Sequence, residues 1–290
     1  MPRDYFPIDF ESDAILDNAP LHLREAVVAF SGGVDSAFSV WRHLNAPEPH
    51  RSCRIHRPLL VHGFDIALAD EASFATAQQA AQRTLADVGL SLLAVRTNFQ
   101  EVVRVNWEHV FAAALVSAMH LCKAECGVAL IGSSEPCSSL IIPWGSSPIT
   151  DHLLSSDTME VVHDGASFGR SAKVAGIADW QAACDNLRVC WQGVHHGRNC
   201  GRCEKCQRTM FNYRCNKLPV PDCLPQGIDY GLLKSIGITS PSLASEWSQI
   251  LATATQNGLD ERWMRIVESK LRRGQRSHGQ QRHWRRLDRF

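Results

Sequence analysis

Six residues near the N-terminus, Ser31-Gly32-Gly33-Val34-Asp35-Ser36, constrain this chain most strongly. They follow the apolar run 26–30 and precede the mainly apolar stretch 37–41, a pattern that predicts a buried strand, a glycine turn and a helix start. The two glycines let the backbone turn tightly and bring its N–H groups close to an anion, while the helix directs the positive end of its dipole to the same point. The sequence therefore predicts a phosphate-binding loop.

The polar side chains of this loop suit the same ligand. Ser31 and Ser36 can donate hydroxyl hydrogens to phosphate oxygens, and Asp35 can either hold Mg²⁺ or brace the loop amides. The loop contains no lysine, which excludes a Walker A motif.

Composition bounds the class of protein. The chain has 290 residues with 30 basic and 30 acidic side chains, a balance that argues against a surface coated for nucleic acid. No apolar run approaches the roughly 20 residues of a membrane span, and the N-terminus lacks the apolar region of a signal peptide, so we expect a cytoplasmic protein without membrane contact. In a reducing compartment the 11 cysteines favour metal binding or catalysis over disulfides.

Apolar strand patterns alternate with helical patterns through the first half of the chain. After the loop helix, the expected elements are a strand at 59–66, a helix at 71–88, a strand at 90–95, a helix at 106–126 and a strand at 128–131. This rhythm predicts an α/β fold with a doubly wound, mostly parallel sheet, whose ligands bind beyond the carboxyl ends of the strands. The glycine loop, 62–65 and 132–134 should then meet at one edge, with Gly132 and Ser133 contacting the ligand.

A second motif lies near residue 200. Cys190, Cys200, Cys203 and Cys206 follow the pattern Cys-x9-Cys-x2-Cys-x2-Cys, which lets four thiolates converge on one Zn²⁺ in a tight knuckle. An iron-sulfur cluster is the alternative occupant. The reserve ligands are Cys215, His195 and His196.

The string from Ser31 to Ser36 resembles the SGGxDS signature of the PP-loop, or N-type ATP pyrophosphatase, superfamily. The resemblance implies an adenine nucleotide alpha hydrolase-like fold and an enzyme that uses ATP and Mg²⁺, splits ATP between the α and β phosphates and places AMP on a substrate oxygen. It also implies that His62, Gly63 and Phe64 form the nucleobase wall, although His62 alone also suits a structural role at a strand end. Lys173, and after it Arg170, would neutralise the departing pyrophosphate; the alternative is a surface charge pair.

Both motifs in this order resemble the 7-cyano-7-deazaguanine synthase branch of that superfamily over roughly residues 26–215. In that branch zinc is structural and lies beside the active site, and ATP activates a deazapurine carboxylate for attack by ammonia. This chain departs from the branch at 106–112, which replaces a Val-Pro-x-Arg-Asn type element. The resemblance therefore implies an adenylating ligase acting on a small, purine-like acceptor that it does not identify.

The irregular segment 135–172 is the expected acceptor pocket, with Asp151 reading an N–H edge or positioning a base; the alternative is an ordinary solvent loop. Cys137 raises a second chemistry, because sulfur-transferring relatives attack the adenylated oxygen with a cysteine persulfide and yield a thiolated nucleobase or tRNA base. A protein that donates ammonia or sulfur is then an expected partner. A non-catalytic nucleotide sensor or nucleic-acid-binding protein remains the third option.

The expected organisation is a lead-in at 1–25, an ATP pyrophosphatase domain at 26–218 with the knuckle at 190–206, a helical extension at 219–270 and a basic tail at 271–290. The tail contains seven arginines. Such a tail can bind tRNA phosphates. We favour the alternative, a solvated or disordered end. The expected oligomeric states include a homodimer.

Overall fold

The computed structural model describes residues 25–45, 52–140, 142–190 and 197–287. Its centre is a five-stranded sheet with the strand order β3-β2-β1-β4-β5 and parallel pairing throughout. The strands are β1 (Glu25–Ala29), β2 (Arg54–His62), β3 (Leu93–Arg96), β4 (Val128–Gly132) and β5 (Glu160–Asp164). After β1 the chain adds β2 and β3 on one side and then β4 and β5 on the other, so the order reverses between β1 and β4. The predicted α/β fold with a parallel sheet is confirmed.

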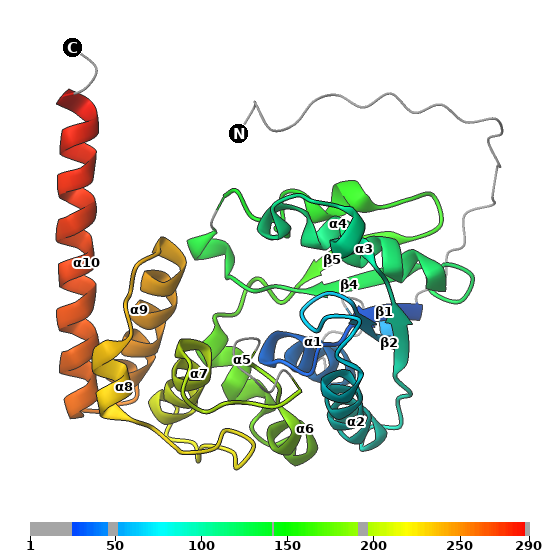
Figure 1. Ribbon diagram of the computed structural model, residues 1–290. Helices are drawn as coiled ribbons and strands as arrows, with labels where there is room; N and C mark the ends of the chain where they lie inside the picture. The colour runs from blue at the N-terminus through cyan, green and yellow to red at the C-terminus, as the bar shows by residue number, and fades with distance from the viewer. Residues whose placement is uncertain (1–24, 46–51, 141, 191–196, 288–290) are drawn as a thin grey trace.

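Helices cover both faces of the sheet (Figure 1). One face packs against α1 (Val34–Leu44), α2 (Glu71–Ala86) and α5 (Arg170–Ile177), and the opposite face against α4 (Trp107–Met119). Successive residues of a strand point to opposite faces, and β1 shows this directly. Val28 belongs to the core on the α1 side, whereas Val27 belongs to the core on the α4 side.

The C-terminal helices form a core of their own. It contains Phe211 of α7 (Glu204–Cys215), Trp247 of α9 (Pro241–Gln256) and Trp263 of α10 (Arg262–Leu287). The ring centroid of Phe211 lies 5.5 Å from that of Trp247 and 5.0 Å from that of Trp263. The expected boundary at residue 271 falls inside α10, which runs beside α9 (Figure 1).

Shorter elements complete the described chain. They are α3 (Phe99–Val102), α6 (Gln181–Asn186), α8 (Tyr230–Ser235) and the 3-10 turns η2 (His120–Cys122), η3 (Cys137–Ser139) and η4 (Asp151–Leu154). Within the described residues, no helix combines the length and the apolar character needed to cross a membrane.

Two expectations about strands are wrong. The strand expected at 59–66 instead spans Arg54–His62, and its first part carries Arg54 and Arg57, which pair with Glu25 at 2.6 Å and Glu125 at 2.7 Å. The irregular segment 135–172 contains β5, whose two central valines are flanked by polar residues. Pairing with β4 supplies the burial that this short sequence does not signal.

Candidate functional site

The loop after β1 has the geometry of a tight turn into a helix. Gly32 has a φ of +77°, a left-handed conformation that favours glycine, and Gly33 is the extended residue that precedes α1. The Ser36 hydroxyl donates to the Gly33 carbonyl at 3.0 Å, and Ser31 Oγ accepts from the Gly33 N–H at 3.4 Å. Val34 begins the helix and is buried. The loop is therefore fixed by its own side chains at the N-terminus of α1.

The end of β4 lies directly against this loop. A Cβ at Gly132 would lie 3.0 Å from the Asp35 carbonyl oxygen and 3.2 Å from Ser39 Oγ, so only glycine allows this approach without a shift. Parallel sheets commonly bind ligands at the position where the strand order reverses. The glycine loop and Gly132 meet at that position, between β1 and β4.

Asp35 is the charged centre of the loop. Its carboxylate accepts from Arg170 Nη2 at 2.8 Å and from Lys173 Nζ at 3.1 Å, both on α5. Burial alone would raise the pKa of Asp35, but the positive charges of Arg170 and Lys173 outweigh it and hold the pKa below its usual value. Asp35 is therefore an ionised carboxylate at neutral pH.

A buried ionic network continues from Arg170 into the C-terminal helices. Glu246 of α9 lies 3.3 Å from Arg170 Nε and 2.6 Å from Arg208 Nη1. Arg208 also lies 2.9 Å from Glu204, one turn earlier on α7. The side chain of Glu246 is 6% exposed, so this carboxylate fixes two arginines away from bulk water.

Two hollows flank the loop. The first, the loop cavity, has a volume of about 90 Å³. Its lining consists of Ser31, Gly33, Val34, Asp35, Ser36, Asp65, Arg170, Arg188, Val189, Cys190 and Lys205. The second, the strand-end cavity, has a volume of about 280 Å³ and is bounded mainly by residues at the carboxyl ends of β1, β2 and β4 and by α4. Asp35, Asp65 and Lys205 line both cavities.

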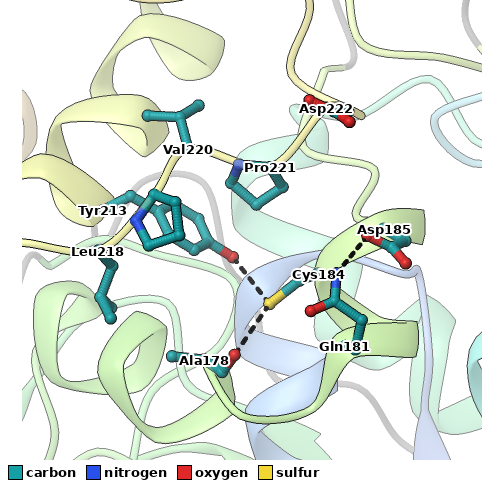
Figure 2. A pocket seen from close by; sticks show the side chains of 10 residues that line it. Ala178, Gln181, Cys184, Asp185, Tyr213, Leu218, Val220, Pro221 and Asp222 are labelled. Atoms are coloured by element: carbon teal, nitrogen blue, oxygen red, sulfur yellow. Dashed lines mark hydrogen bonds between the residues drawn. The ribbon is translucent and has the colours of Figure 1, made fainter.

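Two other hollows are less suited to binding a phosphate. The one in Figure 2, about 200 Å³, carries acids such as Asp185 and Asp222 and no lysine or arginine, so it does not suit a phosphate. A groove of about 830 Å³ runs along α1 and α5 past Phe38 and Trp41. Its cation Arg42 is already paired with Asp164.

The sequence prediction missed two cations of the loop cavity, Arg188 and Lys205, and placed Asp65 at the ligand edge only as part of 62–65. Arg188 donates to Asp65 at 2.6 Å and to the Ser31 carbonyl at 3.3 Å. Lys205 lies between Cys203 and Cys206, and burial together with the neighbouring charge of Arg170 lowers its pKa to about 8. Nothing in the sequence near Arg188 marks it, whereas the position of Lys205 inside the cysteine motif was an available signal.

The two predicted pyrophosphate cations have different surroundings. Arg170 lines the loop cavity. Lys173 is 1% exposed and donates to Asp35 and to the Ser133 carbonyl, so it lies behind Asp35 rather than in the lining of either cavity. The prediction ranked Lys173 ahead of Arg170, whereas Arg170 is the one of the two that lines the loop cavity.

Of the predicted nucleobase wall, Phe64 lines the strand-end cavity, whereas His62 and Gly63 belong to the lining of neither that cavity nor the loop cavity. His62 is fully buried, stacks on Phe74 with centroids 4.1 Å apart and donates from Nε2 to the Ala67 carbonyl at 2.9 Å. Gly63 has a φ of +104°, and a Cβ there would lie 1.9 Å from the Thr97 carbonyl oxygen. The packing explains both His62 and Gly63, in agreement with the structural alternative for His62.

The loop after β4 also differs in detail from the prediction. Gly132 and Ser134 line the strand-end cavity. Ser133 is buried, and its hydroxyl donates to the Glu135 carbonyl, so this side chain is turned inward. The contribution of Ser133 to the site is its carbonyl, which holds Lys173.

Asp151 is a fully buried residue of η4. Its carboxylate accepts from the Ser146 hydroxyl at 2.6 Å, the Ser147 N–H at 2.9 Å and His163 Nδ1 at 2.7 Å. These contacts occupy both oxygens, so Asp151 is not placed to read the edge of an acceptor. It orients His163, whose Nε2 is buried and has no hydrogen-bond partner among the described residues.

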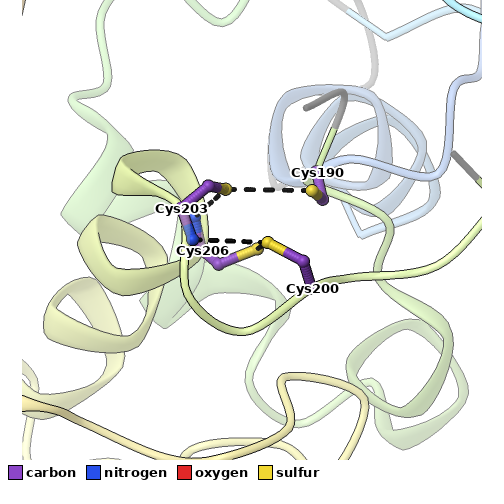
Figure 3. Close-up of side chains that lie close together, drawn as sticks. All are labelled: Cys190, Cys200, Cys203 and Cys206. Atoms are coloured by element: carbon purple, nitrogen blue, oxygen red, sulfur yellow. Dashed lines mark hydrogen bonds between the residues drawn. The ribbon is translucent and has the colours of Figure 1, made fainter. Parts of the chain in front are cut away.

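The four predicted metal ligands lie together (Figure 3). The sulfurs of Cys190 and Cys203 are 3.8 Å apart, those of Cys200 and Cys206 are 3.9 Å apart, and all four lie within 4.8 Å of one another. A tetrahedral ion with metal–sulfur bonds of about 2.3 Å places its ligands about 3.8 Å apart. A hydrogen bond from Cys206 lowers the pKa of the Cys203 thiol, which favours the thiolate that a metal binds. The four side chains can therefore hold a metal ion such as zinc.

The other cysteines lie elsewhere. None of the 11 cysteines, all of which lie in the described part of the chain, forms a disulfide. Cys215 is buried in the core of the C-terminal helices, and the reserve ligands His195 and His196 lie outside the described residues. Burial raises the pKa of Cys126 to about 12, so this thiol stays protonated. Cys137 is exposed on η3 and belongs to the lining of neither the loop cavity nor the strand-end cavity.

No protein-family model matches this chain, and a search of curated proteins finds no match. The geometry of the site therefore provides the argument for its function.

Proposed function

We propose that this chain is an adenylating enzyme of the N-type ATP pyrophosphatase kind, with a doubly wound sheet, which binds ATP at Ser31–Ser36 and transfers AMP to an acceptor oxygen. The observation on which this rests is the loop cavity. There, a glycine turn at a helix N-terminus faces three cations from separate segments, Arg170, Arg188 and Lys205. Backbone amides, a helix dipole and converging cations form an anion site suited to phosphates.

The charges in the site suit cleavage between the α and β phosphates. Negative charge builds up on the pyrophosphate as it leaves, and cations fixed beforehand stabilise that charge without reorganising. Arg170 is fixed by Asp35 and Glu246, and Arg188 by Asp65. Positioning and electrostatics of this kind account for most catalysis of phosphoryl-type transfer.

Asp35 and Asp65 are the residues that would hold Mg²⁺. Both carboxylates line the loop cavity and the strand-end cavity, so they lie where the two hollows meet. Carboxylate oxygens are the protein ligands that Mg²⁺ prefers beside phosphates. Asp35 also braces Arg170 and Lys173, and the two roles are compatible because its side chain remains 20% exposed.

The strand-end cavity is the proposed nucleoside site. Its wall includes Phe64, Phe111 and Leu115, which offer aromatic and apolar surface to a base. The cavity adjoins the loop cavity through residues that line both, including Ser31 and Ser36. Adenosine in the larger hollow then places its phosphates at the glycine turn.

For the second substrate we favour a small, nucleobase-like acceptor whose carboxylate or carbonyl oxygen takes AMP and is then attacked by ammonia or an amine. The resemblance to 7-cyano-7-deazaguanine synthases supports this choice, as does the four-cysteine site, for which we propose structural zinc. A persulfide route needs a thiolate near the reacting phosphate. Cys137 lies outside the lining of both cavities, which favours nitrogen over sulfur.

The test is pyrophosphate release from Mg²⁺–ATP by the metal-loaded full chain, with a panel of purine and deazapurine carboxylates and ammonium. We expect release with at least one acceptor, with AMP formed in equal amount, and loss of release in Arg170→Ala. Tight ATP binding without release for any acceptor would exclude the enzyme and leave a nucleotide sensor.

A further inference from the structure

Of the three cations in the loop cavity, Lys205 lies inside the four-cysteine knuckle and Arg188 lies just before it. Arg188 precedes Cys190 by two residues, and Lys205 directly precedes Cys206. Both line the cavity, as does Cys190 itself. The residues that can hold a metal and the residues that can hold an anion are thus part of one short structure.

Hydrogen bonds join the knuckle to the glycine loop. The Arg188 N–H donates to the Gly32 carbonyl at 2.8 Å, so the segment leading to Cys190 lies on the turn itself. Asn199 Oδ1 accepts from the N–H groups of Val189 and Cys190 at 2.9 and 3.2 Å and ties this segment to the residue before Cys200. A change in the knuckle therefore reaches the anion site through the backbone.

Both acidic and basic side chains act on the ammonium group of Lys205. Asp35 and Glu246 attract it, while Arg170 and Arg208 repel it. In the part of the chain that the structure describes, no carboxylate comes within ion-pair distance of its ammonium group. A partly buried cation in this setting gains most from a bound anion, because burial strengthens the charge–charge contact.

We propose that the metal bound by the four cysteines and the anion bound in the loop cavity stabilise each other through Lys205 and Arg188. The metal fixes the backbone segments that carry Arg188 and Lys205. An anion of the pyrophosphate class in turn fixes the side chains of these two residues. Coupling between two sites is reciprocal, so the anion must also strengthen retention of the metal. This inference takes the identity of the anion from the proposed function.

The test uses inorganic pyrophosphate and the metal-loaded full chain. Lys205→Met removes the ammonium group and keeps the length of the side chain and all four cysteines. Arg202→Met is the matched control, because Arg202 holds the equivalent place before Cys203, is exposed and lines neither cavity. Calorimetry gives the affinity for pyrophosphate, and transfer of metal to a coloured chelator gives the rate of metal release.

We expect Lys205→Met to weaken pyrophosphate binding about ten-fold or more, as loss of a charge-assisted contact does, and Arg202→Met to change it less than two-fold. At one pyrophosphate concentration, metal release should be several-fold slower from the wild type and Arg202→Met than from Lys205→Met. Competition by free pyrophosphate for the metal is the same for all three proteins and cancels in this comparison.

The inference is overturned if Lys205→Met binds pyrophosphate like the wild type, or if pyrophosphate changes metal release equally in all three proteins. These readouts are independent of turnover. If they hold while no acceptor releases pyrophosphate from ATP, the coupling stands and the proposed enzyme activity fails.

Discussion

Asp35 links the glycine loop to helix α5. Its carboxylate accepts from Arg170 and Lys173, and these cations hold its pKa below the usual value despite burial. A carboxyl group whose pKa is depressed by folding adds stability above its unfolded pKa and loses it as the pH falls through the folded value. The contribution of Asp35 is therefore fully present at neutral pH.

Asp35→Asn should lower the free energy of unfolding by about 3 kcal/mol at pH 7, because it leaves two buried cations without their carboxylate. The difference from the wild type should narrow as the pH falls below about 4, where the Asp35 carboxyl of the unfolded wild type becomes protonated, and should vanish only at the lower pH that protonates the folded one. Urea unfolding at both pH values measures this. Asp157→Asn, at an exposed position, should change little at either pH. An Asp35→Asn difference that is the same at both pH values would contradict the ionised state of Asp35.

At the scale of elements, the sequence predicted the features that depend on contacts between residues close together in the chain. The β1 loop and α1 follow from an apolar run, two glycines and a helix start, and the four cysteines converge because their spacing is itself a knuckle. By contrast, Arg202 and Lys205 occupy equivalent places in the cysteine motif, but only Lys205 lines the loop cavity. The difference between them comes from tertiary packing. The same holds for Glu246, which reaches Arg170 from a distant helix.

Glu246 makes α9 part of the site's support. Glu246→Gln should reduce the free energy of unfolding by about 3 kcal/mol, because Arg170 and Arg208 then share a buried space without their common carboxylate. Ser248→Ala, at an exposed position two residues later on the same helix, should stay within about 0.5 kcal/mol of the wild type. Equal stability of the two variants, measured by urea unfolding, would show that the ionic network does not attach α9 to the rest of the molecule.

At the scale of the whole molecule, the metal site lies where several elements meet. Cys190 and Cys206 belong to the same core as β1, α1 and α5. Loss of an ion at such a position should loosen the packing between the sheet and α7, since metal-binding free energy adds to folding free energy.

One zinc per chain should be found by elemental analysis, and none in Cys203→Ser. Without the ion the midpoint of thermal unfolding should fall by roughly 10 °C. Cys137→Ser, at an exposed cysteine outside the knuckle, should keep both the metal and the midpoint. A metal-free wild type with an unchanged midpoint would remove the structural role, and an iron-sulfur absorption band would replace zinc with a cluster.

The most direct test of the central claim is a crystal structure with Mg²⁺ and α,β-methylene-ATP, in which the bond proposed to break cannot be cleaved. The account predicts β and γ phosphates in the loop cavity, against Gly33, Arg170 and Lys205, and adenosine in the strand-end cavity beside Phe64. Phosphates bound elsewhere, for example in the groove beside Trp41, or a glycine loop without nucleotide at saturating concentration, would contradict it.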